Sequence, residues 1–305
     1  MDGSTRGYGM TKHGHVKETR VKAHASEFRR VVRVFLGRRI VIFGVVTIAG
    51  LIICALLAPY LAPYDPYEQN LSGALQKPGF NHWLGTDAVG RDTLSRIIYG
   101  TRTSLMIGIV AVAIAALIGM TLGLIAGFFG GKGYTFIMRF IDAMMCFPPI
   151  LMALILAGIL GAGMKNVMFA IGIALIPAYC RLMCAQVLSV RENDYVTAAR
   201  SIGATNIRVM IRHILPNCFP PLIVLITVNI GMAILSEAGL SFLGLGIEAP
   251  KAAWGKMVSD GYLYLRTQPV LSFAPGLAIM LVVFAFNMVG DGLRDALDPK
   301  LRGTL

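Results

Sequence analysis

Apolar residues in this chain gather into six long runs, separated by shorter polar stretches. Each run is close to the 20 or so apolar residues that a helix needs to cross the hydrocarbon core of a bilayer. The runs are residues 40–62, 104–129, 136–160, 167–188, 219–240 and 271–290. The pattern therefore predicts an all-α membrane protein with six transmembrane helices.

Composition supports this class and excludes a soluble enzyme. Of the 305 residues, 56% are hydrophobic and only 14% are charged, whereas a soluble domain carries about 25% charged residues. The five cysteines lie in or beside apolar runs, where they act as small hydrophobic side chains. Cys180 and Cys184 are one helical turn apart, but no histidine is near them, so we expect no metal site.

The basic residues predict which way the helices face. Ten lysines and arginines precede Ile40, and no folded basic module follows them, so they indicate membrane topology and not nucleic-acid binding. If this leader (residues 1–39) is cytoplasmic, 20 of the 28 basic residues lie on the inner side. We therefore expect both termini inside, including the tail (residues 291–305), and the loops at residues 63–103 and 241–270 outside.

Prolines interrupt two of the runs. Pro148 and Pro149 are expected to kink the third span, and Pro177 the fourth. Such kinks are tolerated where neighbouring helices or water satisfy the freed carbonyl groups. They indicate helices that line a cavity.

The loop at residues 189–218 is amphipathic, basic and rich in small residues. One face of a first short helix is formed by Tyr195, Ala198, Ala199 and Ile202. Gly203 allows the chain to turn. A second short helix carries Ile207, Met210 and Ile211, with Arg208 and Arg212 facing water or acids, and Pro216 is expected to end it. Two interpretations remain open on physical grounds: the loop fits a groove on a partner protein, or it lies on the lipid surface.

Three polar side chains lie within the apolar runs, where a polar group is costly unless it has a partner or a function. Asp142 is expected to pair with Arg139 one turn earlier, or to form a gate or subunit contact. Glu237 is expected to face the translocation path, pair with a partner subunit, or reach outer water. Asn229 is expected to hydrogen-bond a neighbouring helix.

Glycines also recur at a regular spacing in the second run. Gly119, Gly123 and Gly127 are four residues apart, which favours close helix packing. We expect this stripe to contact a sister subunit.

The loop sequence resembles the cytoplasmic motif of binding-protein-dependent ABC importer permeases. That motif reads Glu-Ala-Ala, three residues, Gly, nine residues, Ile, one residue, Leu-Pro. Here Thr197-Ala198-Ala199 takes the first triplet, Gly203 is in register, and Leu215-Pro216 closes the pattern. Thr197 in place of Glu and His213 in place of Ile depart from it, and both departures resemble the dipeptide, oligopeptide and nickel branch.

Three further segments are similar to the second permease subunit of that branch. They are LGTDAVGRDTLS at residues 84–95, SEAGLSFLGLG at residues 236–246, and the C-terminal run GDGLRD at residues 290–295 with Asp298-Pro299. The resemblance implies the type I ABC importer permease fold, with the transporter domain at residues 103–292. It also implies a multi-pass protein of the bacterial inner membrane.

The resemblance further implies the partners and the contact residues. The partners are a homologous second permease, two ATPase subunits, an extracytoplasmic substrate-binding protein and the lipid bilayer. The residues expected to contact an ATPase are Tyr195, Ala198, Ala199, Ile202, Gly203, Ala204, Arg208 and Pro216.

No catalytic or cofactor site is expected in this chain. Gly131-Lys132 is the nearest approach to a phosphate-binding loop, but Gly133 stands where Ser or Thr is needed. ATP and Mg²⁺ are therefore expected on the partner subunits, which drive alternating access for peptides or related solutes. The alternative is a stand-alone secondary transporter or channel, for which Asp142 and Glu237 are the candidate carboxylates.

Overall fold

The computed structural model describes residue 32 and residues 34–297. Most of the predicted basic leader and the last eight residues of the predicted tail lie outside this part of the chain. Within it, the chain is helical and contains one isolated β-bridge, between Thr86 and Asp92. The all-α prediction is confirmed.

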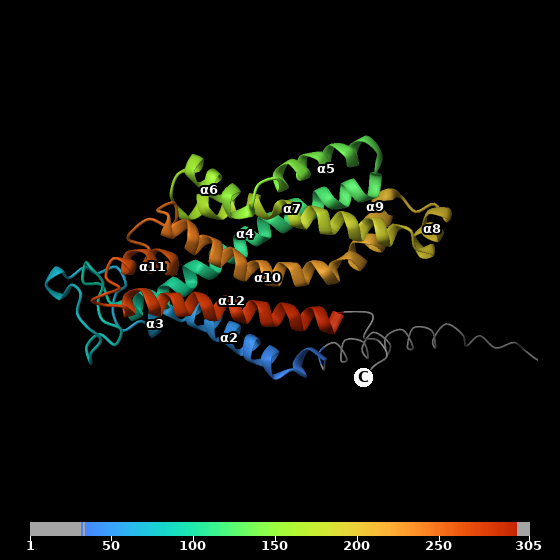
Figure 1. Cartoon of the computed structure of the whole chain (residues 1–305). Helices are drawn as coiled ribbons and strands as arrows, with labels where there is room; N and C mark the ends of the chain where they lie inside the picture. The colour runs from blue at the N-terminus through green and yellow to red at the C-terminus, as the bar shows by residue number, and fades with distance from the viewer. Residues whose placement is uncertain (1–31, 33, 298–305) are drawn as a thin grey trace, which may run out of the picture.

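Five helices are long and apolar enough to cross a membrane, as judged over the described residues, and the count rises to six if a bent pair forms one span (Figure 1). The helices are α2 (Arg39–Leu56), α3 (Ala58–Leu61), α4 (Thr93–Phe129), α5 (Gly131–Met145), α6 (Pro149–Leu160), α7 (Met164–Arg191), α8 (Asp194–Ser201), α9 (Asn206–Val209), α10 (Leu215–Phe242), α11 (Trp254–Tyr262) and α12 (Val270–Leu297). Two short segments complete them, the 3₁₀ helix η1 (Leu71–Gly73) and the π-helical η2 (Met210–Ile214).

The second and the last span extend into polar segments beyond their hydropathy runs. The second span begins at Thr93, 11 residues before the predicted start, because Asp92 caps it by accepting a hydrogen bond from the Ser95 N–H at 2.8 Å. The last helix continues to Leu297, into the predicted tail. Both extensions are polar helical turns, which hydropathy alone does not detect.

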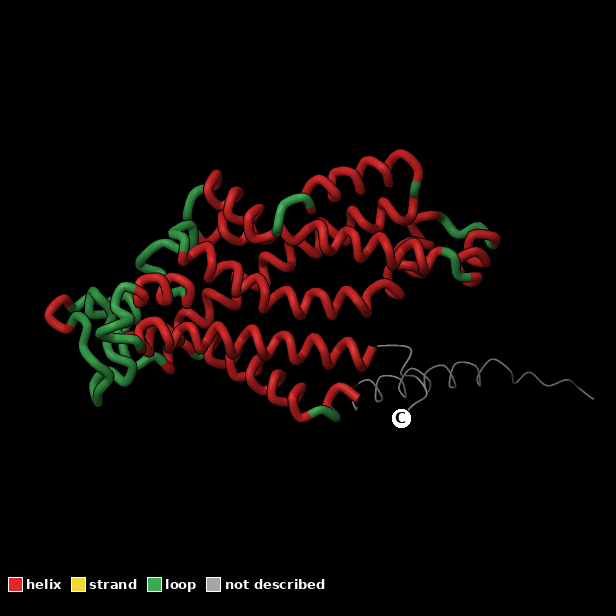
Figure 2. The backbone as a smooth tube through the Cα atoms, in the orientation of Figure 1, coloured by secondary structure: helices red, strands yellow, loops and turns green. Residues whose placement is uncertain are grey.

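The third predicted span is not one kinked helix but two. The axes of α5 and α6 differ by 89°, with a break between Met145 and Pro149. Pro148 and Pro149 cause the break, because neither has the N–H that would continue the hydrogen bonds of α5. Figure 2 shows this break as a short loop about midway along the bundle.

The glycine stripe of α4 contacts α7 within the same chain, and not a sister subunit as expected. A Cβ atom added at Gly119 would lie 2.7 Å from both the Ile176 carbonyl oxygen and Tyr179 Cβ. The same crowding recurs at Gly123 and Gly127. Small-residue spacing therefore sets the close approach of the two central helices of the bundle.

The first and last long helices start and end at the same end of the molecule. Arg38, which precedes α2, forms an ion pair with Asp295 in the last turns of α12. Figure 1 places α8 at this end too and α11 at the opposite end. We call these the α8 end and the α11 end.

Candidate functional site

The chain between α7 and α10 forms a compact turn at the α8 end. Helix α8 closes with two hydrogen bonds, from the Gly203 N–H to the Arg200 carbonyl at 2.9 Å and from the Ala204 N–H to the Ala199 carbonyl at 3.1 Å. This is the Schellman arrangement, and Gly203 has the positive φ, 83°, that it requires. Thr205 then caps α9 by accepting from the Arg208 N–H at 3.4 Å. The predicted turn at Gly203 is confirmed.

One side of this segment is anchored in the main hydrophobic core. Val196, Val209 and Ile214 are fully buried there, and Ala199 is nearly so. The core continues into α4, α7 and α10. A displacement of the segment therefore cannot occur without moving these helices.

Two arginines strengthen the anchor. Arg191, the last residue of α7, donates from Nη1 to the Gly127 carbonyl at 2.9 Å. The guanidinium of Arg200 lies 5.3 Å from the ring centre of Phe128, near the end of α4. Both contacts connect the segment to the same end of α4.

The other side of the segment exposes apolar side chains. Ile202 is 86% exposed, Ile207 65%, and Tyr195 and Ile211 about half. Ala198, Arg208 and Gly203 are exposed as well, and Ala204 is half-buried. Such a surface, apolar with basic neighbours, is available for a partner.

Two expectations for this segment were wrong. Ala199 does not share a face with Tyr195, Ala198 and Ile202, because it packs inward beside Val196. Pro216 does not end a helix, since it lies exposed in the first turn of α10, and α9 continues through η2 into α10. The π turns of η2, in which the Leu215 N–H bonds the Met210 carbonyl, accommodate the missing proline donor.

The polar residues within the spans have partners that the sequence did not identify. Asp142 forms its ion pair with Arg181 of α7, and not with Arg139. Asn229 makes the expected interhelical bond, donating from Nδ2 to Tyr179 Oη at 3.1 Å.

Glu237 is completely buried inside the subunit. We had expected it to face the translocation path, to pair with a partner subunit or to reach the outer water, and this expectation was wrong. Its Oε1 accepts from Ser241 Oγ at 2.6 Å, and its Oε2 has no hydrogen-bond partner among the described residues. The helices α10 and α11 approach closely here, because Gly255 of α11 has no Cβ; one added there would lie 3.0 Å from Ser241 Cβ and nearer still to Ala238 Cα.

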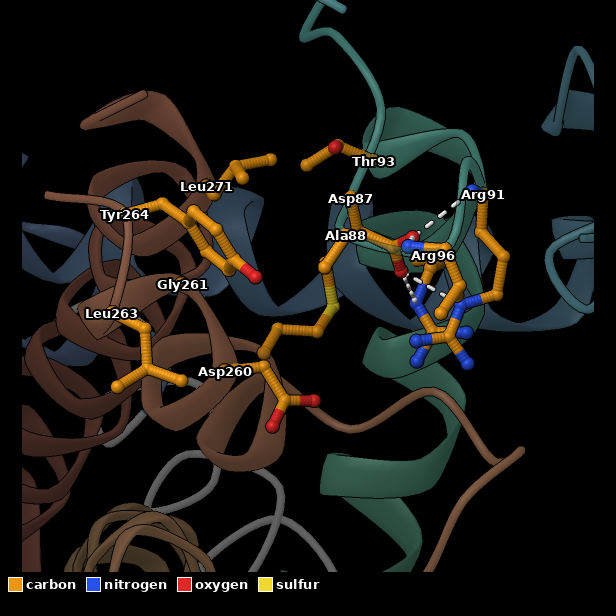
Figure 3. Close-up of a pocket in the computed structure, with 12 residues that line it drawn as sticks. Asp87, Ala88, Arg91, Thr93, Arg96, Asp260, Gly261, Leu263, Tyr264 and Leu271 are labelled. Carbon is orange, nitrogen blue, oxygen red and sulfur yellow. Dashed lines mark hydrogen bonds and ion pairs between the residues drawn. The ribbon is translucent and has the colours of Figure 1, made fainter. Parts of the chain in front are cut away.

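A cavity of about 230 Å³ lies at the α11 end, between the start of α4 and α11 (Figure 3). Its charges are paired within the chain: Asp87 accepts from Arg91 Nε at 2.7 Å and lies 3.6 Å from Arg96 Nε. Arg96 also donates to the carbonyls of Pro66 and Pro250. These contacts fasten the loop before α4 to the loop before α11, so we interpret the site as structural.

The fold and the segment between α7 and α10 define the membrane component of an ABC importer, and the comparisons with known proteins agree. Residues 119–303 match the family described as binding-protein-dependent transport system inner membrane component, and residues 26–78 match the N-terminal TM domain of oligopeptide transport permease C. The chain belongs to the binding-protein-dependent transport system inner membrane component family. The resemblance found in the sequence is confirmed.

Several curated relatives are similar over most of their length. The dipeptide transport system permease protein DppC of Alkalihalophilus pseudofirmus is 44% identical over 91% of this chain and 91% of its own. The glutathione transport system permease protein GsiD of Pectobacterium atrosepticum is 41% identical over 93% and 94%. The nickel transport system permease protein NikC of Escherichia coli K12 is 41% identical over 85% and 93%.

A solved structure supports the fold. A chain from the inward-facing MetNI methionine ABC transporter superposes with a TM-score of 0.56 at 16% identity, covering 67% of this chain and 97% of that one. The predicted type I importer permease fold agrees with this likeness. The chain is a multi-pass membrane permease subunit.

Proposed function

We propose that this chain is one of two permease subunits of an ATP-driven importer of peptides in a bacterial inner membrane. Relatives named for dipeptide transport support peptides as the substrate class. Relatives named for glutathione and nickel transport indicate that other solutes use closely similar permeases.

The observation that carries this proposal is the two-sided segment of α8 and α9. Its buried side continues into the helix cores, and its exposed side presents Tyr195, Ile202, Ile207 and Ile211. A partner that binds this exposed side in one nucleotide state and releases it in another would move the spans. The ATPase subunits take this place in the proposal, and ATP and Mg²⁺ are bound there and not by this chain.

The basic residues give the proposal its orientation. The basic leader directly precedes α2 in the sequence, and the described α2 starts and α12 ends at the α8 end, so the proposal places that end in the cytoplasm. The α11 end faces outward, where a substrate-binding protein delivers the peptide. A homologous second permease completes the translocation path.

Cysteine crosslinking in cells that contain the complete transporter tests this arrangement. In a background with the five native cysteines replaced, Ile202→Cys is expected to crosslink to an ATPase subunit. Ala199→Cys, three residues away but buried, is the matched control and should not. If Ile202→Cys instead reacts with a membrane-impermeant reagent added outside intact spheroplasts, or finds no ATPase, the proposal is wrong.

A further inference from the structure

The break between α5 and α6 places irregular backbone at membrane depth. The two helices have 15 and 12 residues, and each alone is shorter than the 20 or so residues that span a bilayer. We call residues 145–149, which join them, the elbow. Figure 2 shows the elbow near the middle of the bundle and not at either end.

The elbow lies exposed on the surface of the subunit. All five of its residues are exposed, with Met145 at 45% and Phe147 at 53%. Because Pro149 has no N–H, the Met145 carbonyl lacks the donor that a continuous helix would give it. Hydrocarbon cannot satisfy such groups, so irregular backbone at this depth is either covered by protein or lines water.

An ion pair lies next to the elbow. Asp142 is one turn before it on α5, and its carboxylate contacts the guanidinium of Arg181 on α7. Arg181 is ten residues from the end of α7, which places it about 15 Å along the helix from that end. The two side chains are 43% and 51% exposed.

The Asp142–Arg181 ion pair and the exposed backbone of the elbow therefore lie on one surface at membrane depth. A half-exposed ion pair facing lipid is costly, and charges at this depth mark substrate or ion paths. Interrupted helices near the midplane form binding sites in other transporters for the same reason, because their free backbone groups face the solute.

We propose that the elbow, together with Asp142 and Arg181, lines the translocation path and contacts the solute as it passes. Asp142 and the elbow carbonyls suit an ammonium group, and Arg181 suits a carboxylate, which it can bind through two parallel hydrogen bonds. This pair of groups fits a zwitterion such as a short peptide. The inference rests on the proposed function, whose substrate contacts it specifies.

The native Cys146 of the elbow gives a direct test. In the complete transporter in membrane vesicles, a charged methanethiosulfonate reagent is expected to modify Cys146, and excess dipeptide to slow the reaction. Mass spectrometry locates the label, Cys146→Ser removes it, and the buried Cys180 is the internal control that a folded complex must leave unmodified. Modification only by an apolar maleimide would mean that the elbow faces lipid. Modification by neither reagent would mean that the sister permease covers it. Either result overturns the inference.

Transport kinetics supply the second test. Arg181→Gln is expected to raise the KM for a dipeptide about ten-fold, since a charge-assisted hydrogen bond to its carboxylate is lost. Arg38→Gln is the matched control, because it breaks another interhelical ion pair far from the elbow. An unchanged KM in Arg181→Gln, with normal uptake by the wild-type transporter, overturns the inference alone. Failure of the wild-type transporter to import any dipeptide would instead overturn the proposed function.

Discussion

Gly203 offers the sharpest test of the segment between α7 and α10. Its φ is 83°, and an added Cβ would meet no atom within 4 Å. Replacement by valine therefore creates no clash with neighbours, and its effect comes from the backbone alone. A non-glycine residue in this region costs about 1–2 kcal/mol, and a β-branched one is among the least tolerated. In the proposed complex, that energy must be supplied when the segment adopts the Schellman turn that an ATPase binds.

We expect Gly203→Val to weaken ATPase binding by about 5- to 30-fold, the factor that corresponds to 1–2 kcal/mol. The affinity of the purified permease pair for its ATPase subunits and ATP-dependent uptake in proteoliposomes would both be measured. Gly203→Asn should have a smaller effect, because asparagine tolerates this conformation. Gly161→Val, in the turn between α6 and α7, is the control for strain elsewhere, since Gly161 also has a φ of 83° and open space around it. Wild-type affinity in Gly203→Val would refute the reasoning.

Two further predictions concern the packing of helices within the subunit. Gly123→Ala should destabilise the subunit by about 1–3 kcal/mol, because the new Cβ would lie 2.9 Å from Met183 Cβ. Gly276→Ala is the control and should be neutral or slightly stabilising, because its new Cβ would meet nothing within 4 Å. Thermal unfolding of the purified permease pair compares the two variants, and equal midpoints would contradict the packing argument. Trp254→Phe removes the hydrogen bond from Nε1 to the Ile97 carbonyl at 3.0 Å and should lower the unfolding free energy by about 1–3 kcal/mol; an unchanged midpoint would show that this bond adds nothing.

The spans could be predicted from the sequence because hydropathy is a property of each run by itself. The broken third span was only partly predictable. Pro148 and Pro149 indicate an interruption, but the 89° turn depends on how α5 and α6 pack on α7. The helix cap at Asp92 was also not predicted, because hydropathy does not identify polar helical turns.

The two sides of the segment between α7 and α10 were predicted in part. Gly203 was identified because a turn in this position needs a positive φ, which is a local requirement. The inward side, above all Val196, was missed because Val196 lies in the same helical turn as the exposed Tyr195, and only the packing against the bundle separates them. The pairing of Asp142 with Arg181 joins residues 39 apart in the sequence, which periodicity within one helix cannot indicate.

The unbroken course of α9, η2 and α10 has a mechanical consequence. This run spans Asn206–Phe242, 37 residues, and is about 55 Å long at the rise of a helix. A swing of about 10° about its α8 end would carry the far end through about 10 Å, if the run behaves as a stiff lever arm of that length. The far end supports α11 through the close contact of Gly255 with Ala238 and Ser241. A small stroke at the α8 end would thereby be amplified at the α11 end.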